Sequence, residues 1–423
     1  MDKLILQNGL SISYYQLPMT HSICIGLYVK VGSVMETVEN NGVSHLLEHL
    51  HFRRLGALSQ NELYDMTDGL GTTLCAETGQ EYTRYYLKVR PEYFINCLQL
   101  FVDIMTFVGW TDEEFMAERN VVFDEKLGCA SNSIYNSTLR SMLWGAHPLS
   151  LAVIGTEQSL LSLSKQDVID HKKRYYTANN MALVITGNID DYAKSLVNNL
   201  FSRVPLETTS CSYFKLGYSP IVCKRKPDVL LLSDETEMID VCLCFDVLAS
   251  VNPEALTLLN SILGGGTTSL LQRNIREYLG VSSDIYSEIE CHCDTSLIKI
   301  TFSTRAESVA LILEQLVKTL DYTKVALSDI DISKNIRFYT DNLLFWLDDP
   351  EFLNFYTAWE LHIMRNSFKD IDDLSSKFSR VTVTDLKKLA TEVFQPHKAS
   401  ILLYGKLSTL DESCITMILN KLR

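Results

Sequence analysis

The chain has 423 residues, of which 46% are hydrophobic, with only 9 prolines and 19 glycines. A chain of this length exceeds what one core usually supports, so we expect two domains, and the composition excludes a disordered protein. The formal net charge of −14 argues against a nucleic-acid partner, because phosphates attract basic surfaces. Without a run of about 18 apolar residues, no membrane partner is expected either.

The N-terminus and the cysteines both favour a cytoplasmic location. The opening residues MDKL lead directly into strand-like sequence, with no hydrophobic signal segment and no Arg-rich transit segment. The 11 cysteines follow no regular framework, which is typical of reduced thiols. In the pairs Cys242/Cys244 and Cys291/Cys293 the spacing of two favours two thiols on one strand face over a metal cluster.

The first half of the chain alternates strand and helix patterns. Apolar residues recur at every second position in the expected strands and at every third or fourth position in the expected helices. In chain order we expect strands at 3–7, 11–16 and 22–31, a helix after Gly42, strands at 70–76 and 81–89, a helix at 94–105, a capped helix from Thr111, a helix at 165–175, a strand at 181–186 and a helix from Asp190.

The second half repeats this order more loosely. The expected elements are a strand at 239–247, helices from Pro253 and Ser269, strands at 284–290 and 296–304, a long helix from Glu307, a helix at 384–394 and a strand at 399–404. The closing helix and strand echo the pattern of residues 165–186. We therefore predict an α+β fold of two homologous domains, with domain boundaries at 1–205 and 219–423 and a Thr/Ser-containing linker at 206–218.

The segment His45-Leu46-Leu47-Glu48-His49 carries the chemistry of the first half. Side chains four residues apart on a helix share one face, so His45 and His49 can bind the same zinc ion. Glu48 shares that face and can accept a proton from zinc-bound water, which would then attack a peptide carbonyl. The H-x-x-E-H spacing inverts the commoner H-E-x-x-H and is a zinc-peptidase signature. The competing interpretation is an amphipathic helix that merely contains histidines.

Catalytic zinc needs a third protein ligand. The capped helix that starts at Thr111 offers two carboxylates, Glu118 and Glu125, which lie seven positions apart and therefore on one face. From the spacing alone either one can be the ligand, and the other then supports it or contacts substrate. By contrast, His51 points to another face of its helix and is not expected to bind the metal.

Several further motifs follow in a fixed order along nearly the whole chain. They are the glycine and serine at 32–33, the stretch 39–49 around the zinc motif, the stretches 76–86 and 118–125, and the stretches 154–157 and 174–181. This series resembles the pitrilysin/insulinase metallopeptidases, especially short subunits like those of mitochondrial processing peptidase. The resemblance implies antiparallel sheets with helices on one face, two such domains forming half of a clam-shaped chamber.

The resemblance also assigns the metal ligands. It makes His45, His49 and Glu125 the ligands of one Zn²⁺ per chain, Glu48 the base and Glu118 a supporting acid. It further implies that an edge strand binds the backbone of the substrate by strand addition. The residues that this strand would contribute are Leu74, Cys75, Ala76, Glu77 and Thr78. Cys75 departs from the family, which usually has Asn beside Ala76.

In the second domain, the family completes the substrate site with an Arg and, seven residues later, a Tyr. The glycine stretch 264–266 and Arg276 resemble this region, but position 283 is Ser, and Tyr286 lies three residues further on. An oxyanion would then lose a phenol donor from this chain. We therefore expect a homologous subunit, in a homodimer or heterodimer, to complete the site.

Together these features predict a cytoplasmic zinc-dependent endopeptidase that cleaves extended peptides. The leader of a ribosomally made peptide precursor is one such substrate. The alternative is a non-catalytic peptide-binding or scaffold subunit of a peptidase complex, which would be expected to carry a broken zinc motif. All four essential positions, His45, Glu48, His49 and Glu125, are intact.

Overall fold

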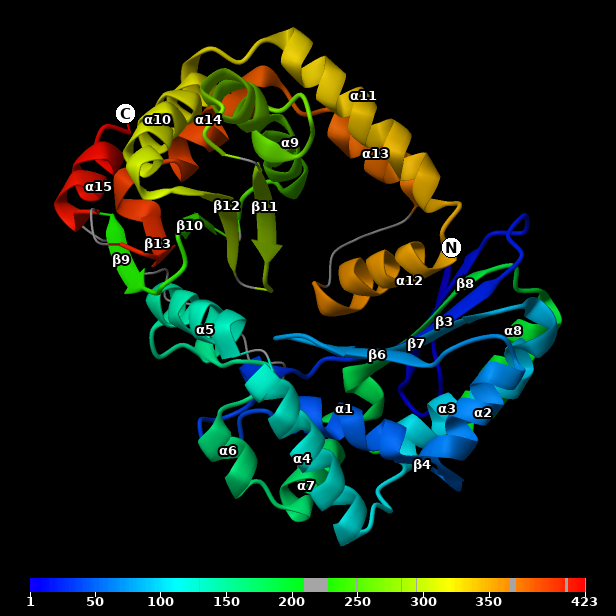
Figure 1. Cartoon of the computed structure of the whole chain (residues 1–423). Coiled ribbons are helices and arrows are strands. Elements are labelled where there is room, and N and C mark those ends of the chain that lie inside the picture. The colour runs from blue at the N-terminus through cyan, green and yellow to red at the C-terminus, as the bar shows by residue number, and fades with distance from the viewer. Residues whose placement is uncertain are drawn as a thin grey trace. The chain divides into compact units, whose positions relative to one another are not determined.

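The computed structural model describes residues 1–128, 130–208, 227–248, 250–282, 284–293, 295–364, 370–407 and 410–422. The chain forms two compact units (Figure 1). The first comprises Met1–Arg140, Trp144–Phe214 and Leu344–Asp370, and the second comprises Ser141–Leu143, Lys215–Leu343 and Ile371–Arg423. No helix in the described part of the chain combines the length and the apolar character that a membrane crossing requires.

The first unit is built on a six-stranded sheet in the order β1-β2-β8-β3-β7-β6. Neighbouring strands run antiparallel, except that β2 and β8 are parallel. β6 therefore ends the sheet at one edge. The strands are β1 (Asp2–Ile5), β2 (Ser11–Gln16), β3 (Ile23–Val29), β6 (Cys75–Thr78), β7 (Thr83–Val89) and β8 (Met181–Gly187), with a separate short hairpin of β4 (Arg54–Leu55) and β5 (Leu58–Ser59).

Helices pack against one face of this sheet and enclose the main hydrophobic core. Figure 1 shows α1, α2 and α3 on that side. The helices of this unit are α1 (Val43–Arg53), α2 (Gln60–Gly69), α3 (Phe94–Thr106), α4 (Asp112–Gly128), α5 (Ala130–Trp144), α6 (Glu157–Ser162), α7 (Lys165–Tyr175) and α8 (Asp191–Ser202). Capping boxes start α2, α6 and α7, which is why these helices begin where they do.

The opposite face is covered by a segment from much later in the chain. Helix α12 (Pro350–Ala358) packs on β3 and β8, and Figure 1 shows it across the sheet from α1. The π-helix Trp359–Ile363 follows directly, and its His362 Nε2 lies 3.1 Å from Ser13 Oγ of β2. Asn354 is fully buried and donates to the carbonyls of Cys24 at 3.2 Å and Val184 at 2.8 Å, while Tyr28 Oη donates to its Oδ1 at 2.8 Å. Gly26 makes room, since a Cβ there would lie 2.4 Å from Asn354 Oδ1.

This segment differs from the sequence expectation in two ways. Residues 344–370 belong by their contacts to the first unit, although their position in the chain placed them in the predicted domain 219–423. Both faces of β3 are consequently buried, rather than one. The predicted linker 206–218 lies mostly outside the described residues, which resume at 227.

The second unit has a five-stranded sheet in the order β11-β12-β10-β13-β9, antiparallel except for the parallel pair β13 and β9. This matches the order and directions of β6-β7-β3-β8-β2 in the first unit, so the predicted α+β class with two similar domains is confirmed. The strands are β9 (Asp228–Ser233), β10 (Met238–Leu248), β11 (Ile285–Cys291), β12 (Thr295–Arg305) and β13 (Ala399–Gly405). The helices are α9 (Pro253–Gly264), α10 (Val309–Val325), α11 (Asp329–Trp346), α13 (Ile371–Ser379), α14 (Val383–Val393) and α15 (Glu412–Leu419), with a π-helix at Gln272–Glu277.

Most predicted elements lie within one or two residues of the observed ones. The main error concerns residues 60–78, where the sequence suggested a strand at 70–76. Helix α2 occupies Gln60–Gly69, and strand β6 begins only at Cys75. The capping box formed by Ser59 and Glu62 was a sequence signal for this helix.

Candidate metal centre

Helix α1 is held at its N-terminus by a buried carboxylate. Glu36 Oε2 accepts from the backbone N–H of Gly42 at 2.7 Å, and Oε1 accepts from that of Ser44 at 2.9 Å. Burial raises the pKa of Glu36, and these hydrogen bonds oppose the rise. Gly42 has φ +95°, which strongly favours glycine, and a negative charge is favoured at a helix N-terminus. The first turn of α1, which carries His45, is thereby fixed.

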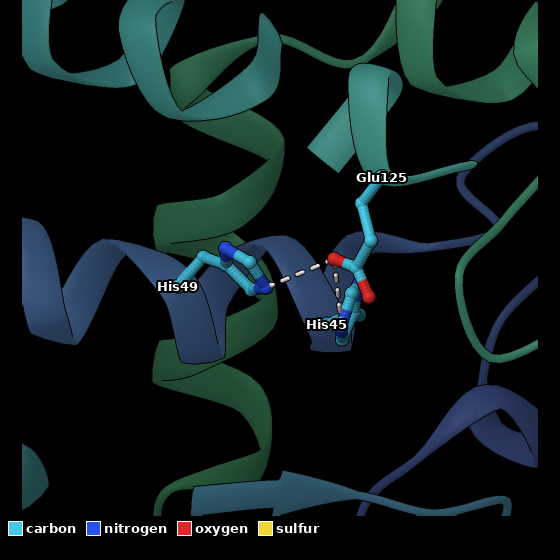
Figure 2. A group of neighbouring side chains, drawn as sticks. All are labelled: His45, His49 and Glu125. Atoms are coloured by element: carbon cyan, nitrogen blue, oxygen red, sulfur yellow. Dashed lines mark ion pairs between the residues drawn. The ribbon is translucent and has the colours of Figure 1, made fainter. Parts of the chain in front are cut away.

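Three side chains converge between α1 and α4. His45 Nε2 lies 3.9 Å from Glu125 Oε2, and His49 Nε2 lies 3.5 Å from the same oxygen (Figure 2). One ligand atom from each residue lies within 4.8 Å of the others. Zinc–nitrogen bonds of about 2.0 Å in a tetrahedral site place neighbouring ligand atoms about 3.3 Å apart. The donor set therefore fits one zinc ion, provided that ligand atoms that lie within 4.8 Å of one another draw together to about 3.3 Å.

The structure separates the two carboxylates that the spacing left open. Glu118 Oε1 lies 3.0 Å from His49 Nδ1, on the side of the ring away from Glu125. With the carboxylate as acceptor, Nδ1 carries the proton and Nε2 keeps its lone pair for a metal. Glu125 alone reaches the Nε2 atoms of both histidines. The ligand role of Glu125 and the supporting role of Glu118 stay predictions, and these distances are compatible with them.

The two imidazoles differ in their electrostatics. Burial, and then the neighbouring His49, lower the pKa of His45 to about 3, so this ring is neutral and able to act as a ligand at physiological pH. Burial also opposes protonation of His49. The hydrogen bond to Glu118 and the negative charges of Glu48, Glu118 and Glu125 outweigh it and raise the pKa of His49. This excess of negative charge favours a bound cation.

Glu48 lies on α1 between the two histidines and is 8% exposed. Thr78, on strand β6, donates its hydroxyl hydrogen to Glu48 Oε2. Burial raises the pKa of Glu48, and the hydrogen bond from Thr78 partly counteracts the rise. A carboxylate with a raised pKa is a better proton acceptor at neutral pH. The sequence placed Thr78 in substrate binding, whereas its side chain is turned to the predicted base.

A buried polar network anchors the other side of α1. His51 is fully buried, with Nδ1 3.0 Å from Tyr85 Oη and Nε2 2.7 Å from Lys172 Nζ. Tyr85 Oη also lies 2.8 Å from Tyr176 Oη. His51 thus faces away from the metal ligands and ties α1 to β7 and α7. Sequence reasoning did not single out Lys172, although its spacing from Val168 places it on the buried face of α7.

The five substrate-binding residues predicted at the edge strand have side chains that point in different directions. Leu74 precedes β6 and is buried in the main core, so its side chain cannot meet a peptide. Ala76 and Thr78 lie on the same sheet face as α1, and Cys75 and Glu77 lie on the opposite face. Because β6 pairs only with β7, its other backbone edge has no strand partner among the described residues.

The remaining predicted site residues belong to the second unit. Arg276 lies in the π-helix Gln272–Glu277 and is exposed, and Tyr286 lies on β11 and is 43% exposed. Their role stays a prediction, and Ser283 lies outside the described residues. Cys242 and Cys244 share one face of β10, with their sulfurs 3.6 Å apart. Among the described residues, only His45, His49 and Glu125 gather as three potential metal ligands.

Comparison with known proteins gives consistent results. Residues 12–157 match the family described as Insulinase (Peptidase family M16), and residues 162–337 match the Peptidase M16 inactive domain. An uncharacterized zinc protease of Bacillus subtilis, YmxG, is 29% identical over 318 residues, covering 74% of this chain and 76% of that protein. An uncharacterized zinc protease of Rickettsia felis is also 29% identical, covering 74% of this chain and 75% of its own length.

Solved structures show the same fold. A protease from Helicobacter pylori superposes with a TM-score of 0.86 at 21% identity, covering 95% of this chain and 98% of that one. A peptidase M16 inactive domain protein from Pseudomonas fluorescens gives a TM-score of 0.80 at 15% identity, covering 96% and 97%. The matched segment 12–157 contains the whole H-x-x-E-H motif and Glu125. The chain therefore belongs to the insulinase family of peptidases, family M16.

Proposed function

We propose that this protein is a zinc-dependent endopeptidase that cleaves extended peptides, with one Zn²⁺ per chain held by His45, His49 and Glu125. The observation that carries the proposal is the convergence of these three side chains beside the buried carboxylate of Glu48. Relatives named zinc proteases support the same chemistry.

Each residue of the centre has a separate task in peptide hydrolysis. A bound zinc ion lowers the pKa of a water molecule and polarises a carbonyl group. Glu48 accepts the proton of the attacking water and delivers it to the leaving amine. Thr78 fixes one carboxylate oxygen of Glu48 on the side of strand β6. Glu118 holds the ring of His49 in the orientation and tautomer that a ligand needs.

The edge of β6 is the proposed substrate-binding element. An extended peptide can add to this edge and form main-chain hydrogen bonds, which give affinity without demanding a particular sequence. Thr78 lies on β6 and contacts Glu48, so a peptide on this edge lies beside the proposed base. Leaders of ribosomally made peptide precursors are one class of extended substrate in the cytoplasm.

We also infer a homologous partner, in a homodimer or a heterodimer. The second unit carries Arg276 but has Tyr286 ten residues later rather than seven. A second copy of this chain has the same Ser283, so in a homodimer the pair stays incomplete, whereas a different subunit with the complete pair would supply the missing phenol donor to the developing oxyanion. Cleavage by the purified chain alone and after mixing with a homologous subunit measures this contribution. Full activity of the chain alone would contradict it.

The test of the proposal combines metal content with cleavage of an unstructured peptide. The wild-type protein should contain about one zinc per chain and cleave the peptide, either alone or with its partner. Glu48→Gln should retain the zinc and reduce kcat by about 10²- to 10⁴-fold, because it removes the general base. Glu39→Gln, an exposed carboxylate shortly before α1, serves as the matched control and should leave kcat unchanged.

Two outcomes would contradict the proposal. Unchanged turnover in Glu48→Gln would remove this residue as the base. A zinc-loaded protein that binds peptides but cleaves none, alone or with a homologous subunit, would instead identify a non-catalytic peptide-binding subunit.

A further inference from the structure

Strand β6 presents one acidic side chain on the face away from the metal. Glu77 lies directly opposite Arg84 of β7 in the antiparallel register. Its neighbours Ala76 and Thr78 point toward α1, and Thr78 contacts Glu48. A peptide that adds to β6 would alternate in the same way. Some of its side chains would face the metal, and the one that pairs with Glu77 would face away from it.

The Glu77 carboxylate is held in a fixed position. Arg84 Nε donates to its Oε2 at 2.8 Å, and Tyr82 Oη donates to its Oε1 at 2.7 Å. The guanidinium of Arg84 lies 4.5 Å from the ring centroids of both Tyr86 and Phe355. These contacts order the carboxylate before any peptide binds, so that binding need not restrict its rotamers further.

Glu77 remains accessible despite these contacts. Its side chain is 45% exposed, whereas that of Arg84 is only 16% exposed. A carboxylate has about four acceptor positions, two on each oxygen. Arg84 Nε and Nη2 both contact Oε2, at 2.8 and 2.6 Å, so the remaining capacity lies on Oε1, which accepts from Tyr82. The carboxylate can therefore accept a further hydrogen bond from solvent or from a bound peptide.

We propose that Glu77 selects peptides that carry Lys or Arg at the residue paired with it across the β6 edge. The proposal rests on the proposed function, since it requires a peptide strand beside β6. Opposite charges directly across neighbouring strands attract, and like charges repel. A basic substrate residue would lie beside Glu77, which itself lies beside Arg84, so that the charges on the three neighbouring strands would alternate. An acidic substrate residue would instead lie beside the fixed carboxylate of Glu77 and would be repelled.

The test uses one unstructured peptide of fixed sequence in which each position near the cleaved bond is in turn Lys, norleucine or Glu. For the wild type, we expect one position at which kcat/KM is about threefold higher with Lys than with norleucine, and about tenfold higher than with Glu. The preference should weaken at high salt, because the pair lies near solvent. Glu77→Gln should abolish the preference, and Glu77→Lys should reverse it.

Binding measurements separate this proposal from the proposed function. Dissociation constants of the same peptides for the Glu48→Gln protein report the preference without hydrolysis. Suppose that no peptide is cleaved, that Glu48→Gln binds the Lys peptide preferentially, and that Glu48→Gln/Glu77→Gln does not. The proposed function then fails and the proposal for Glu77 stands. The surface variant Glu92→Gln is the matched control, and zinc content with the unfolding temperature verifies that each variant is folded.

Two results would overturn the proposal. One is equal kcat/KM and Kd for Lys, norleucine and Glu at every position. The other is a Lys preference that survives both Glu77→Gln and Glu77→Lys.

Discussion

The two units share one strand order but differ in the helix that contacts the edge strand of the sheet. In the first, α1 follows β3 and contacts the edge strand β6, and in the second, α9 follows β10 and contacts the edge strand β11. Helix α1 carries three histidines and a glutamate, whereas the buried face of α9 consists mainly of leucine, isoleucine and alanine. The segment matched as an inactive domain, 162–337, overlaps the second unit in residues 215–337.

Packing distance accounts for part of this difference. At Gly264, the end of α9 lies so close to β11 that a Cβ would come within 2.3 Å of the backbone nitrogen of Ser287. Between α1 and β6, the carboxylate of Glu48 and the hydroxyl of Thr78 occupy the interface. The same scaffold can therefore build a tight apolar contact or a polar site. A few side chains at the helix–edge-strand interface decide which one forms.

The faces away from these helices also correspond. Glu77 lies opposite Arg84 in the first unit, and Glu288 lies opposite Lys299 in the second. The outer face of the first sheet is covered by α12, which inserts Asn354 between β3 and β8. This insertion joins residues from both halves of the chain in one unit. A substitution at Asn354 should therefore have the largest effect of those predicted below.

Asn354→Ala should destabilise the first unit by about 2–4 kcal/mol. The change leaves the Tyr28 hydroxyl and the carbonyls of Cys24 and Val184 buried without their partner. Urea unfolding measures the loss in the free energy of unfolding, and hydrogen exchange of the backbone amides in β3 and β8 shows that it occurs in these strands. The control Glu351→Gln, on the same helix, disrupts only a half-exposed ion pair with Lys88 and should change stability by less than about 1 kcal/mol. Equal effects of the two variants would refute a special role for Asn354.

The metal centre, on the α1 side of the first sheet, allows a second test of the difference between the two units. Glu118→Gln should weaken zinc affinity by about 10- to 100-fold, because the neutral amide orients and polarises His49 less well. Competition with a chelator measures the affinity. Glu113→Gln, an exposed carboxylate on the same helix, should leave it unchanged. If Glu118→Gln removed zinc completely while Glu125→Ala retained it, the ligand and supporting roles would be exchanged.

Local patterns predicted much of the fold. Strand β2 and helix α7 begin and end at the predicted residues, since alternation and a Ser164/Asp167 capping box mark them in the sequence. The docking of α12 was not predictable in this way. Two of the partners of Asn354 are backbone carbonyls, which carry no side-chain signature.

The candidate site shows the same limit. The spacing of His45, Glu48 and His49 on one helix is a local property and was readable directly. Helix spacing alone left Glu118 and Glu125 open, because residues seven apart share a helix face, and only the family resemblance assigned Glu125 as the ligand. The distances of both carboxylates from the histidines depend on the placement of α4 against α1. The contact of Thr78 with Glu48 likewise depends on tertiary structure, since the two residues are 30 positions apart.

The smallest expected effect concerns the acidic residue next to the Glu288–Lys299 pair. Burial alone would raise the pKa of Glu290, but the hydrogen bond from His292 and the charge of Lys299 outweigh it and lower the pKa to about 2. A pKa lower in the folded than in the unfolded protein gives stability that is present above about pH 4.5 and lost as the pH falls toward 2.

Because the side chain of Glu290 is 27% exposed, solvent screening reduces this contribution to about 1–2 kcal/mol. Glu290→Gln should therefore lower the free energy of unfolding by that amount at pH 7, and the difference from wild type should shrink between pH 4.5 and pH 2. Glu314→Gln, which breaks an exposed pair with Lys421, should change it by less than about 1 kcal/mol at either pH. A Glu290→Gln effect that stayed constant with pH would show that the lost contact is steric rather than electrostatic. The charged pairs Glu77–Arg84 and Glu288–Lys299 would then correspond in their position in the two sheets, while the charges around Glu290 would add nothing to the free energy of unfolding.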